Sequence, residues 1–251
     1  WLKFSDRKQG GTLAISAALF WRHEMADGPV KLTYFPLWAK GPAIALALEL
    51  GGLPWEGAHP ADWKAMKQST PFGHLPILEV PGLGVIGHEA AILNYLASKN
   101  PQLHGASDKD FVVSQQLLSH GEDLYQMLSR VQHTCFDQSK PKDAMDDFWA
   151  ATDSTVHNRK QGVAVFLGIL EKFSAGCGAP LGHFTTSGIT VGECKIFAVL
   201  HALKMIKADV LGPYPALAAF HGRFEELPAA QTILTTGGRM PAPFRQYFIA
   251  G

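Results

Sequence analysis

The first hundred residues contain short blocks of hydrophobic side chains that predict β-strands. Val30–Phe35 (VKLTYF) is rich in β-branched and aromatic residues and ends at Pro36, which predicts a strand followed by a loop. Leu75–Val80 (LPILEV) is a second such run, and Gly82–Gly87 predicts a turn that leads into a short strand. These blocks indicate a small β-sheet.

Two further segments of the same region predict helices. In Pro42–Leu50, Ile and Leu alternate with other residues, a period that a half-buried strand would also show. Ala and Leu nevertheless favour helix, the leading proline suits a first helical turn, and the glycine pair that follows suits a helix end. Ala90–Lys99 predicts a second helix. Strands and helices therefore mix over residues 30–103, which is the size of one small domain.

Beyond residue 107 the apolar residues recur every three or four positions, the period of a helix that faces a core. Thr190 and Glu193 form a capping-box pattern, in which each side chain binds a free N–H of the first helical turn. We expect residues 108–235 to form an all-helical domain. Residues 1–29 then form an N-terminal extension, and residues 236–251 a tail that packs over the body or a site entrance. The helical period is carried by Leu117, Gly121, Leu124, Leu128 and Val131, by Val163, Phe166, Leu170 and Phe173, and by Phe197, Leu200, Leu203 and Ile206.

Composition narrows the class of protein. The chain has 251 residues, with 22 Lys and Arg against 22 Asp and Glu, and a hydrophobic fraction of 47%. That fraction is ordinary for a folded globular protein, and the zero net charge argues against a nucleic-acid partner or a polybasic membrane protein. The apolar run Leu13–Trp21 has about half the residues that a spanning helix needs, so we expect no transmembrane segment.

Cysteine and histidine patterns predict neither a disulfide framework nor a metal site. The three cysteines are scattered, and no C-x-x-C occurs. The histidines of the helical region show no pairing with Cys or a carboxylate at compact ligand spacing, so we expect them to be solvated or hydrogen-bonded. These histidines are His120, His133, His157, His183, His201 and His221.

One segment carries a resemblance to a known family. Residues 61–80 read ADWKAMKQSTPFGHLPILEV, preceded by KLTYF at 31–35 and followed by AAILNYL at 90–96. The helical region adds DVLGPYPALAAF at 209–220. Together these segments resemble the soluble glutathione transferases, closest to the sigma class that includes glutathione-dependent prostaglandin D synthases and S-crystallins. The resemblance implies a thioredoxin-like α/β N-terminal domain, an all-α C-terminal domain and a homodimer.

The resemblance also implies glutathione chemistry at Tyr34. Glutathione attacks electrophiles as a thiolate, because the thiol is a poor nucleophile. A hydroxyl that donates to the sulfur stabilises this anion and lowers the thiol pKa, and Tyr34 stands at the family's position for that donor. A strand tyrosine that only packs on the core is the alternative. The implied activity is conjugation of glutathione to a small hydrophobic electrophile, or glutathione-dependent isomerisation of one.

The same resemblance implies which residues hold glutathione, the co-substrate. Lys40 stands where the family usually has Arg, Trp63 and Lys67 keep the spacing of residues that contact its glycine end, and the bond before Pro76 is expected to be cis. Plain interdomain packing is the alternative for the residues of the electrophile pocket. The implied glutathione contacts are Lys40, Trp63, Lys67, His74, Leu75, Pro76, His88 and Glu89, and the implied electrophile pocket is Phe35, Trp38, Leu128 and Phe136.

Two sites depart from the family pattern. His88-Glu89 stand where the family has Gln-Ser, whose serine and helix N-terminus hold the γ-glutamyl carboxylate. Glu89 would place one carboxylate against another, which is costly at contact distance, unless it binds the amine of glutathione or caps its helix. The acidic residue that a partner subunit offers to this amine aligns with Ser119. Impaired and retained glutathione binding are both open at this point.

These departures support a second hypothesis, a catalytically impaired glutathione-transferase-like scaffold or accessory subunit. Residues 1–29 are not explained by the resemblance, and in this hypothesis they contact a larger complex, in an organelle or at a photosynthetic membrane. We expect a cytoplasmic protein, with a plastid location after removal of a transit peptide as the alternative.

Overall fold

The N-terminal unit is built on a four-stranded mixed sheet. The computed structural model describes residues 28–150 and 162–249. Within them, β1 pairs in parallel with β3 and antiparallel with β4, and β4 pairs antiparallel with β5. The strands are β1 (Val30–Thr33), β3 (Trp55–Ala58), β4 (Ile77–Val80) and β5 (Gly84–Gly87), in the order β3-β1-β4-β5.

Two helices complete this unit in the thioredoxin-like arrangement. α2 (Gly41–Gly51) connects β1 to β3, and α4 (Glu89–Lys99) follows β5 and packs against α2. Residues 41–48 of α2 are all buried, because the helix also contacts α9 and α11 of the helical domain. A helix buried on every side has no polar face, which explains why its sequence resembled a strand. The connections hold β2 (Leu37–Trp38), α3 (Trp63–Met66) and a 3₁₀ turn over Lys67–Ser69.

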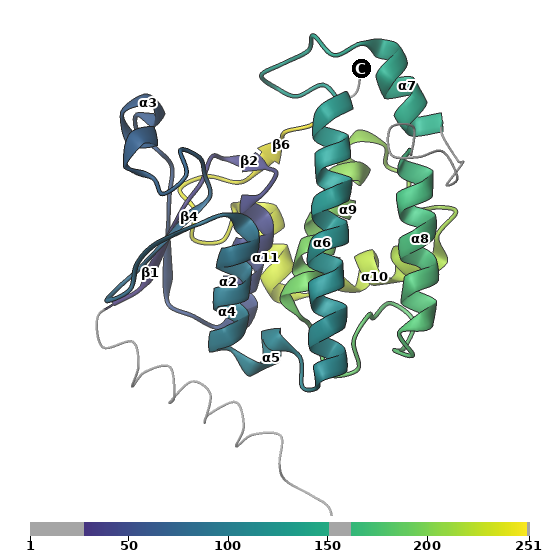
Figure 1. The fold of residues 1–251 in the computed structure, drawn as a ribbon, viewed down its shortest axis with the longest axis horizontal. Helices are drawn as coiled ribbons and strands as arrows, with labels where there is room; N and C mark the ends of the chain where they lie inside the picture. The colour runs from purple at the N-terminus through teal and green to yellow at the C-terminus, as the bar shows by residue number, and fades with distance from the viewer. Residues whose placement is uncertain (1–27, 151–161, 250–251) are drawn as a thin grey trace, which may run out of the picture.

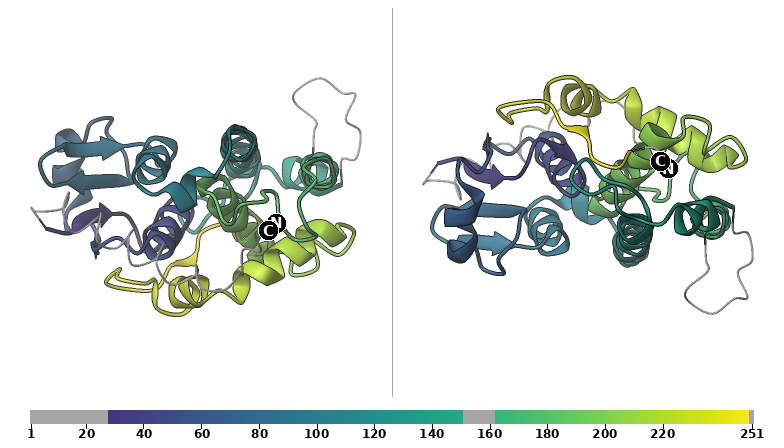
Figure 2. Two further views of the ribbon diagram at one scale, coloured as in Figure 1. Left: turned by 90° about the horizontal axis from the view of Figure 1, so that it is seen from below. Right: turned by 90° about the horizontal axis from the view of Figure 1, so that it is seen from above.

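The helical domain lies beside this unit and centres on two packed helices (Figures 1 and 2). α9 has twelve buried residues and packs along the long helix α6. Gly192 permits this approach, since a Cβ at this position would lie 2.2 Å from the carbonyl oxygen of Ser114. The helices are α5 (Pro101–His104), α6 (Asp108–Val131), α7 (Lys142–Ala150), α8 (Val163–Gly176), α9 (Val191–Ile206), α10 (Pro215–Glu225) and α11 (Pro228–Thr236).

The C-terminal segment returns to the N-terminal unit. β6 (Arg245–Gln246) pairs in parallel with β2, and the yellow trace in Figures 1 and 2 shows this path. Phe244 and Phe248 are buried, and Phe248 also forms an isolated antiparallel bridge with Thr134. The described part of the tail therefore packs over the body.

The predicted fold class is confirmed, with differences in detail. The predicted capping box is present, and Glu193 accepts the N–H of Thr190 at 2.9 Å. The sequence prediction missed β3, whose sequence WEGA contains no β-branched residue and which is held by pairing with β1. The N-terminal extension lies outside the described residues, apart from Gly28 and Pro29.

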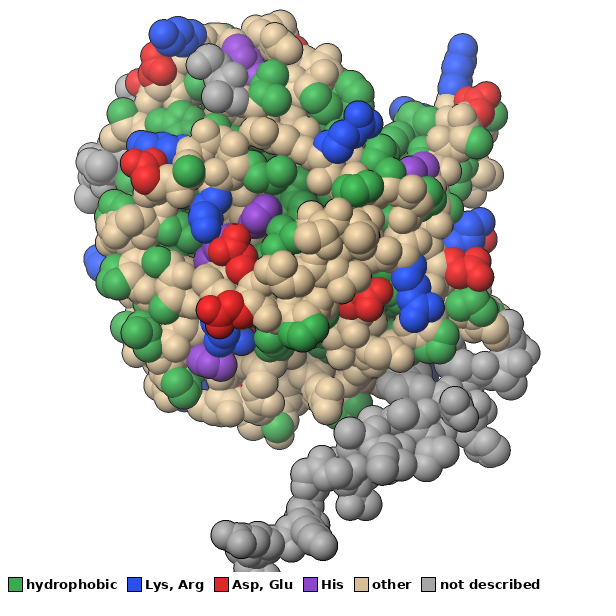
Figure 3. Space-filling model, turned by 180° about the vertical axis from the view of Figure 1, so that it is seen from behind, with side chains coloured by type: hydrophobic (Ala, Val, Ile, Leu, Met, Phe, Trp, Pro, Cys, Tyr) green, Lys and Arg blue, Asp and Glu red, His purple; other side chains and the backbone are tan. Residues whose placement is uncertain are grey.

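The surface agrees with the balanced composition. Basic and acidic side chains are interspersed over the face shown in Figure 3, and no large patch of one sign is visible there. Among the described residues, no helix is long and apolar enough to cross a membrane.

The close approach of α9 and α6 predicts the effect of one added methyl group. Gly192→Ala is expected to lower the free energy of unfolding by about 3 kcal/mol, because overpacking forces the two backbones apart. Gly222→Ala is the control, since a Cβ there meets nothing within 4 Å and alanine favours helix by about 0.5–1 kcal/mol. Urea unfolding followed by circular dichroism measures both, and equal effects of the two substitutions would contradict the packing argument.

Candidate functional site

Tyr34 lies directly after β1, at the junction of the two domains. Its side chain is 6% exposed, and its hydroxyl oxygen accepts the backbone N–H of Lys40 at 3.0 Å. Gly41 makes room for the ring, since a Cβ there would lie 2.2 Å from Tyr34 Cδ1. Burial raises the pKa of Tyr34 above its usual range, although the N–H of Lys40 opposes this shift. The hydroxyl is therefore neutral, and it keeps its own proton to donate to another acceptor.

Four charged side chains of alternating sign cross this junction. Lys195 Nζ lies 2.5 Å from Glu89 Oε2 and 3.0 Å from Glu122 Oε2. Lys40 Nζ lies 2.5 Å from Glu122 Oε1. Both ammonium groups also lie over the ring of Tyr125, at 4.8 Å for Lys40 and 5.0 Å for Lys195. We call these four residues, Lys40, Glu89, Glu122 and Lys195, the junction network.

The junction network determines the direction of the Glu89 carboxylate. Glu89 is the first residue of α4 and is 5% exposed, while Lys195, on α9, is equally buried. Burial raises the pKa of Glu89, and the ammonium of Lys195 opposes this shift. The carboxylate thus faces the helical domain and a cation.

Glu122 holds the other end of the network in place. Burial alone would raise its pKa, but Lys195 and Lys40 hold the pKa of Glu122 down to about 2. The carboxylate is therefore ionised at neutral pH. It bridges the two cations and so connects α6 to the segment that carries Tyr34.

The segment before β4 has the predicted backbone geometry. The Leu75–Pro76 peptide bond is cis, as the sequence predicted. The rings of His74 and His88 lie 5.0 Å apart, and the exposed ring of Phe72 lies 4.5 Å from that of His88. His88, directly before α4, has a φ of 66°, and among the described residues it is the one non-glycine residue with positive φ. Such backbone strain is concentrated at functional sites.

The remaining predicted glutathione contacts lie nearby. The ring of Trp63 packs edge-on against Phe35, with 5.6 Å between centroids, and Phe35 lies 6.0 Å from the ring of Tyr34. Lys67 is exposed, and its side chain reaches Gly73, next to His74. The structure therefore brings together Tyr34, the α3 region and the loop before β4.

The predicted electrophile pocket is not assembled as the sequence suggested. Trp38 and Leu128 are core residues, 2% and 0% exposed, and the Trp38 indole donates to the carbonyl of Ala198. Phe136 is 76% exposed and contacts Tyr247. Phe35 alone of these four is half-buried next to Tyr34. Interdomain packing, the alternative interpretation, therefore describes Trp38 and Leu128 better.

Sequence reasoning missed Lys195, Glu122 and Tyr247. A lysine inside the apolar segment CKIFAVL was the available signal for Lys195, since a lysine is almost never fully buried unless it is paired. Tyr247 comes close to Tyr34 because β6 pairs with β2. The histidine expectation also needs correction, because His221 has Glu225 four residues later, at 3.2 Å.

The buried pair predicts a strong asymmetry between single and double substitution. Lys195→Met is expected to lower the free energy of unfolding by about 3–5 kcal/mol, because it leaves Glu89 buried without its main partner. Adding Glu89→Gln is expected to recover much of this loss. Chemical denaturation of wild type, both single variants and the double variant measures the coupling.

Lys31→Met provides the matched control. Lys31 pairs with Glu79 at 3.4 Å, but both side chains are more than 40% exposed. An exposed pair of this kind contributes about 0–1 kcal/mol. A loss in Lys195→Met no larger than that in Lys31→Met would show that the junction network does not hold the domains together.

Sequence comparison with known proteins finds similarity to glutathione transferases. The family "Glutathione S-transferase, C-terminal domain" matches residues 142–234. Glutathione S-transferase 1 of Ascaris suum is 27% identical over 206 residues, covering 79% of this chain and 91% of the relative. Hematopoietic prostaglandin D synthase of Gallus gallus is 26% identical, covering 79% of this chain and 92% of that protein.

Solved structures show the same fold. Prostaglandin synthase D of Nilaparvata lugens superposes with a TM-score of 0.64 at 20% identity, covering 81% of this chain and 96% of that one. The glutathione S-transferase from Ascaris lumbricoides gives a TM-score of 0.65 at 24% identity, covering 86% and 100%. At these identities the structural likeness shows the fold alone.

Proposed function

We propose that this chain, a glutathione transferase homologue in sequence and fold, transfers glutathione to a small hydrophobic electrophile or uses glutathione to isomerise one. The observation that carries the proposal is the orientation of Glu89. The sequence placed a carboxylate where the carboxylate of glutathione is expected to bind. The ion pair with Lys195, at 2.5 Å between buried side chains, supports a ligand site in which this carboxylate is paired inside the protein.

The chemistry assigned to Tyr34 is stabilisation of the glutathione thiolate. Its hydroxyl is neutral and accepts the N–H of Lys40. This contact polarises the O–H bond and leaves the proton for the sulfur. A hydrogen bond to the thiolate lowers the pKa of the thiol and raises the nucleophile concentration at neutral pH.

Binding of the tripeptide is assigned to the surface around Tyr34. The N–H groups at the start of α4 would receive the γ-glutamyl carboxylate. The Leu75 backbone next to cis-Pro76 would pair with the cysteine of glutathione, and Trp63 and Lys67 would contact its glycine end. His74 and His88 border this surface. Phe35, between Tyr34 and Trp63, is the residue of the predicted pocket best placed to contact an electrophile.

Removal of the Tyr34 hydroxyl tests the assigned chemistry. Tyr34→Phe is expected to lower kcat/KM with glutathione and a chlorinated nitrobenzene by about 100-fold near neutral pH, the usual effect of losing one donor to a developing anion. The loss should shrink as pH rises, because the unassisted thiol then ionises on its own. Steady-state kinetics over a pH series measures this effect.

The control for this experiment is Tyr214→Phe, whose hydroxyl donates to the carbonyl of Ala164 in the helical domain. It should leave the pH profile unchanged. A Tyr34→Phe variant with wild-type kinetics would reject the role of the hydroxyl. Absence of glutathione binding to the wild type at millimolar concentration, measured by calorimetry, would reject the enzyme itself.

The scaffold hypothesis remains the second candidate function, and the C-terminal segment favours it. Tyr247 of this segment interacts electrostatically with Tyr34, and Phe248 is buried against Tyr125, so a segment beyond the helical domain occupies part of the junction. The two candidate functions predict different glutathione binding by the Glu89→Ser variant. A scaffold that lost glutathione binding through Glu89 should gain binding in this variant, whereas the proposed enzyme should bind glutathione no better. Residues 1–29 would contact partners in the scaffold case.

A homodimer is part of the proposal. An apolar surface groove of about 620 Å³ lies between α6 and α8 and includes Ser119, the residue aligned with the family's cross-subunit contact. Ile169 is 47% exposed there. We place the dimer contact along this groove.

For the cellular location we propose the cytoplasm, with a plastid as the alternative.

The dimer assignment predicts the outcome of one charge substitution. Ile169→Glu is expected to convert the dimer to a monomer, because the contact would bury an unpaired carboxylate. Light scattering coupled to size-exclusion chromatography reads the mass. Leu181→Glu serves as control, since Leu181 is 73% exposed and is not one of the groove residues. A dimer that persists in Ile169→Glu and dissociates in Leu181→Glu would place the contact elsewhere.

A further inference from the structure

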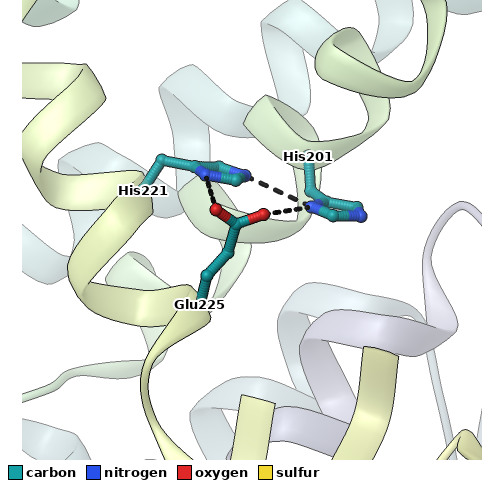
Figure 4. Close-up of side chains that lie close together, drawn as sticks. All are labelled: His201, His221 and Glu225. Carbon is teal, nitrogen blue, oxygen red and sulfur yellow. Dashed lines mark hydrogen bonds and ion pairs between the residues drawn. The ribbon is translucent and has the colours of Figure 1, made fainter. Parts of the chain in front are cut away.

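A second cluster of titratable side chains lies between α9 and α10. His201 comes from α9, while His221 and Glu225 come from α10, and the three side chains point toward one another (Figure 4). Residues four positions apart share one face of a helix, so His221 and Glu225 are neighbours. Packing of α10 against α9 brings His201 opposite them. Each residue offers one ligand atom, and these atoms lie within 4.8 Å of one another.

The spacing of these atoms is close to that of a metal coordination shell. His201 Nδ1 lies 3.2 Å from His221 Nε2 and 3.7 Å from Glu225 Oε1. Two ligands at zinc bond lengths of about 2.0–2.1 Å in a tetrahedral shell are separated by about 3.3 Å. The two nitrogens already have this separation. The other separations are wider, 3.7 Å from His201 Nδ1 to Glu225 Oε1 and within 4.8 Å across the set, so binding requires the Glu225 side chain, which is 35% exposed, to move inward.

Two contacts of His221 Nδ1 compete with each other. His221 Nδ1 faces Glu225 Oε2 at 3.2 Å, a contact that needs a proton on the nitrogen. The same nitrogen faces Lys204 Nζ at 3.3 Å, a contact that needs a lone pair. A neutral imidazole nitrogen offers one or the other. When Nδ1 donates to Glu225, Nε2 carries the lone pair and accepts a hydrogen bond from His201 Nδ1, so a metal at this position would replace that hydrogen bond.

The two imidazoles are held in position by aromatic neighbours. The ring of Trp38 lies 4.5 Å from that of His201, and the ring of Phe197 lies 5.1 Å from that of His221. Partial exposure of His201 and Glu225 leaves a path from solvent.

We propose that His201, His221 and Glu225 bind a divalent transition-metal ion of the zinc type, with water completing the shell. Two imidazoles and one carboxylate form a donor set that suits such an ion. Lys204 competes with a metal ion for this site, because its ammonium group forms an ion pair with the Glu225 carboxylate at 3.5 Å. Its side chain is 30% exposed and can move into solvent. This proposal replaces the expectation, drawn from spacing along the chain, that the chain holds no metal.

Titration of the full chain with ZnCl2 by calorimetry, and with CoCl2 by visible absorption, tests the proposal at neutral pH. We expect one saturable site, and a cobalt spectrum that shows nitrogen and oxygen ligands in fewer than six positions. Glu225→Gln is expected to weaken zinc binding at least tenfold. Lys204→Gln is expected to strengthen it, a result that a purely structural hydrogen-bond network would not give.

Two further variants separate binding at this cluster from binding elsewhere on the chain and from loss of the fold. His183→Gln, a histidine outside the cluster, should bind zinc as the wild type does. His221→Gln should abolish the site, and its circular dichroism spectrum shows whether the fold is retained; if it unfolds, Glu225→Gln and Lys204→Gln decide the matter. No saturable binding at submillimolar ZnCl2, or equal binding by wild type and Glu225→Gln, would overturn the proposal.

Discussion

The buried ammonium of Lys195 is the constraint on which the junction between the domains depends. Desolvation of such a cation costs several kcal/mol unless carboxylates surround it, and here its side chain is 2% exposed. Glu89 and Glu122 supply those carboxylates from two other helices. Because Glu122 also binds Lys40, and the backbone of Lys40 binds the Tyr34 hydroxyl, the position of the proposed catalytic group follows from this one buried charge.

The same constraint changes how the departure from the family pattern is understood. A glutamate at the start of α4 looks incompatible with an anionic ligand when its side chain is placed on the ligand side of the helix. In the structure, one oxygen of the carboxylate pairs with Lys195 inside the protein, and the other is buried without a hydrogen-bond partner. The helix end then keeps its exposed N–H groups and its favourable dipole. An apparent defect in the ligand site thus becomes part of the domain interface.

Local patterns along the chain were sufficient for most of the fold. Helical periods, the capping box at Thr190 and the strand Val30–Phe35 rest on neighbouring residues, and these were predicted. β3 and β6 could not be, because each exists through pairing with a distant strand. The Lys195–Glu89 pair joins residues 106 positions apart, and no spacing rule connects them.

The candidate site residues also separate into those predicted from neighbouring residues and those brought together only by the fold. The role of Tyr34 and the cis bond before Pro76 were expected from the family resemblance of two short segments, residues 31–35 and 61–80. The His221–Glu225 pair was readable as a four-residue spacing, but His201 joins it only through the packing of α9 against α10. Trp38 and Leu128 were assigned to a pocket because the sequence cannot distinguish an apolar side chain that lines a cavity from one that fills a core.

The central claim is that the neutral Tyr34 hydroxyl stabilises the thiolate of bound glutathione. Ultraviolet absorbance of the thiolate, titrated with pH in the complex of wild-type protein and glutathione, tests it most directly. The account predicts that the bound thiol titrates at least one pH unit below a free thiol, whose pKa is about 8.5. A bound thiol that titrates at the free value would contradict it.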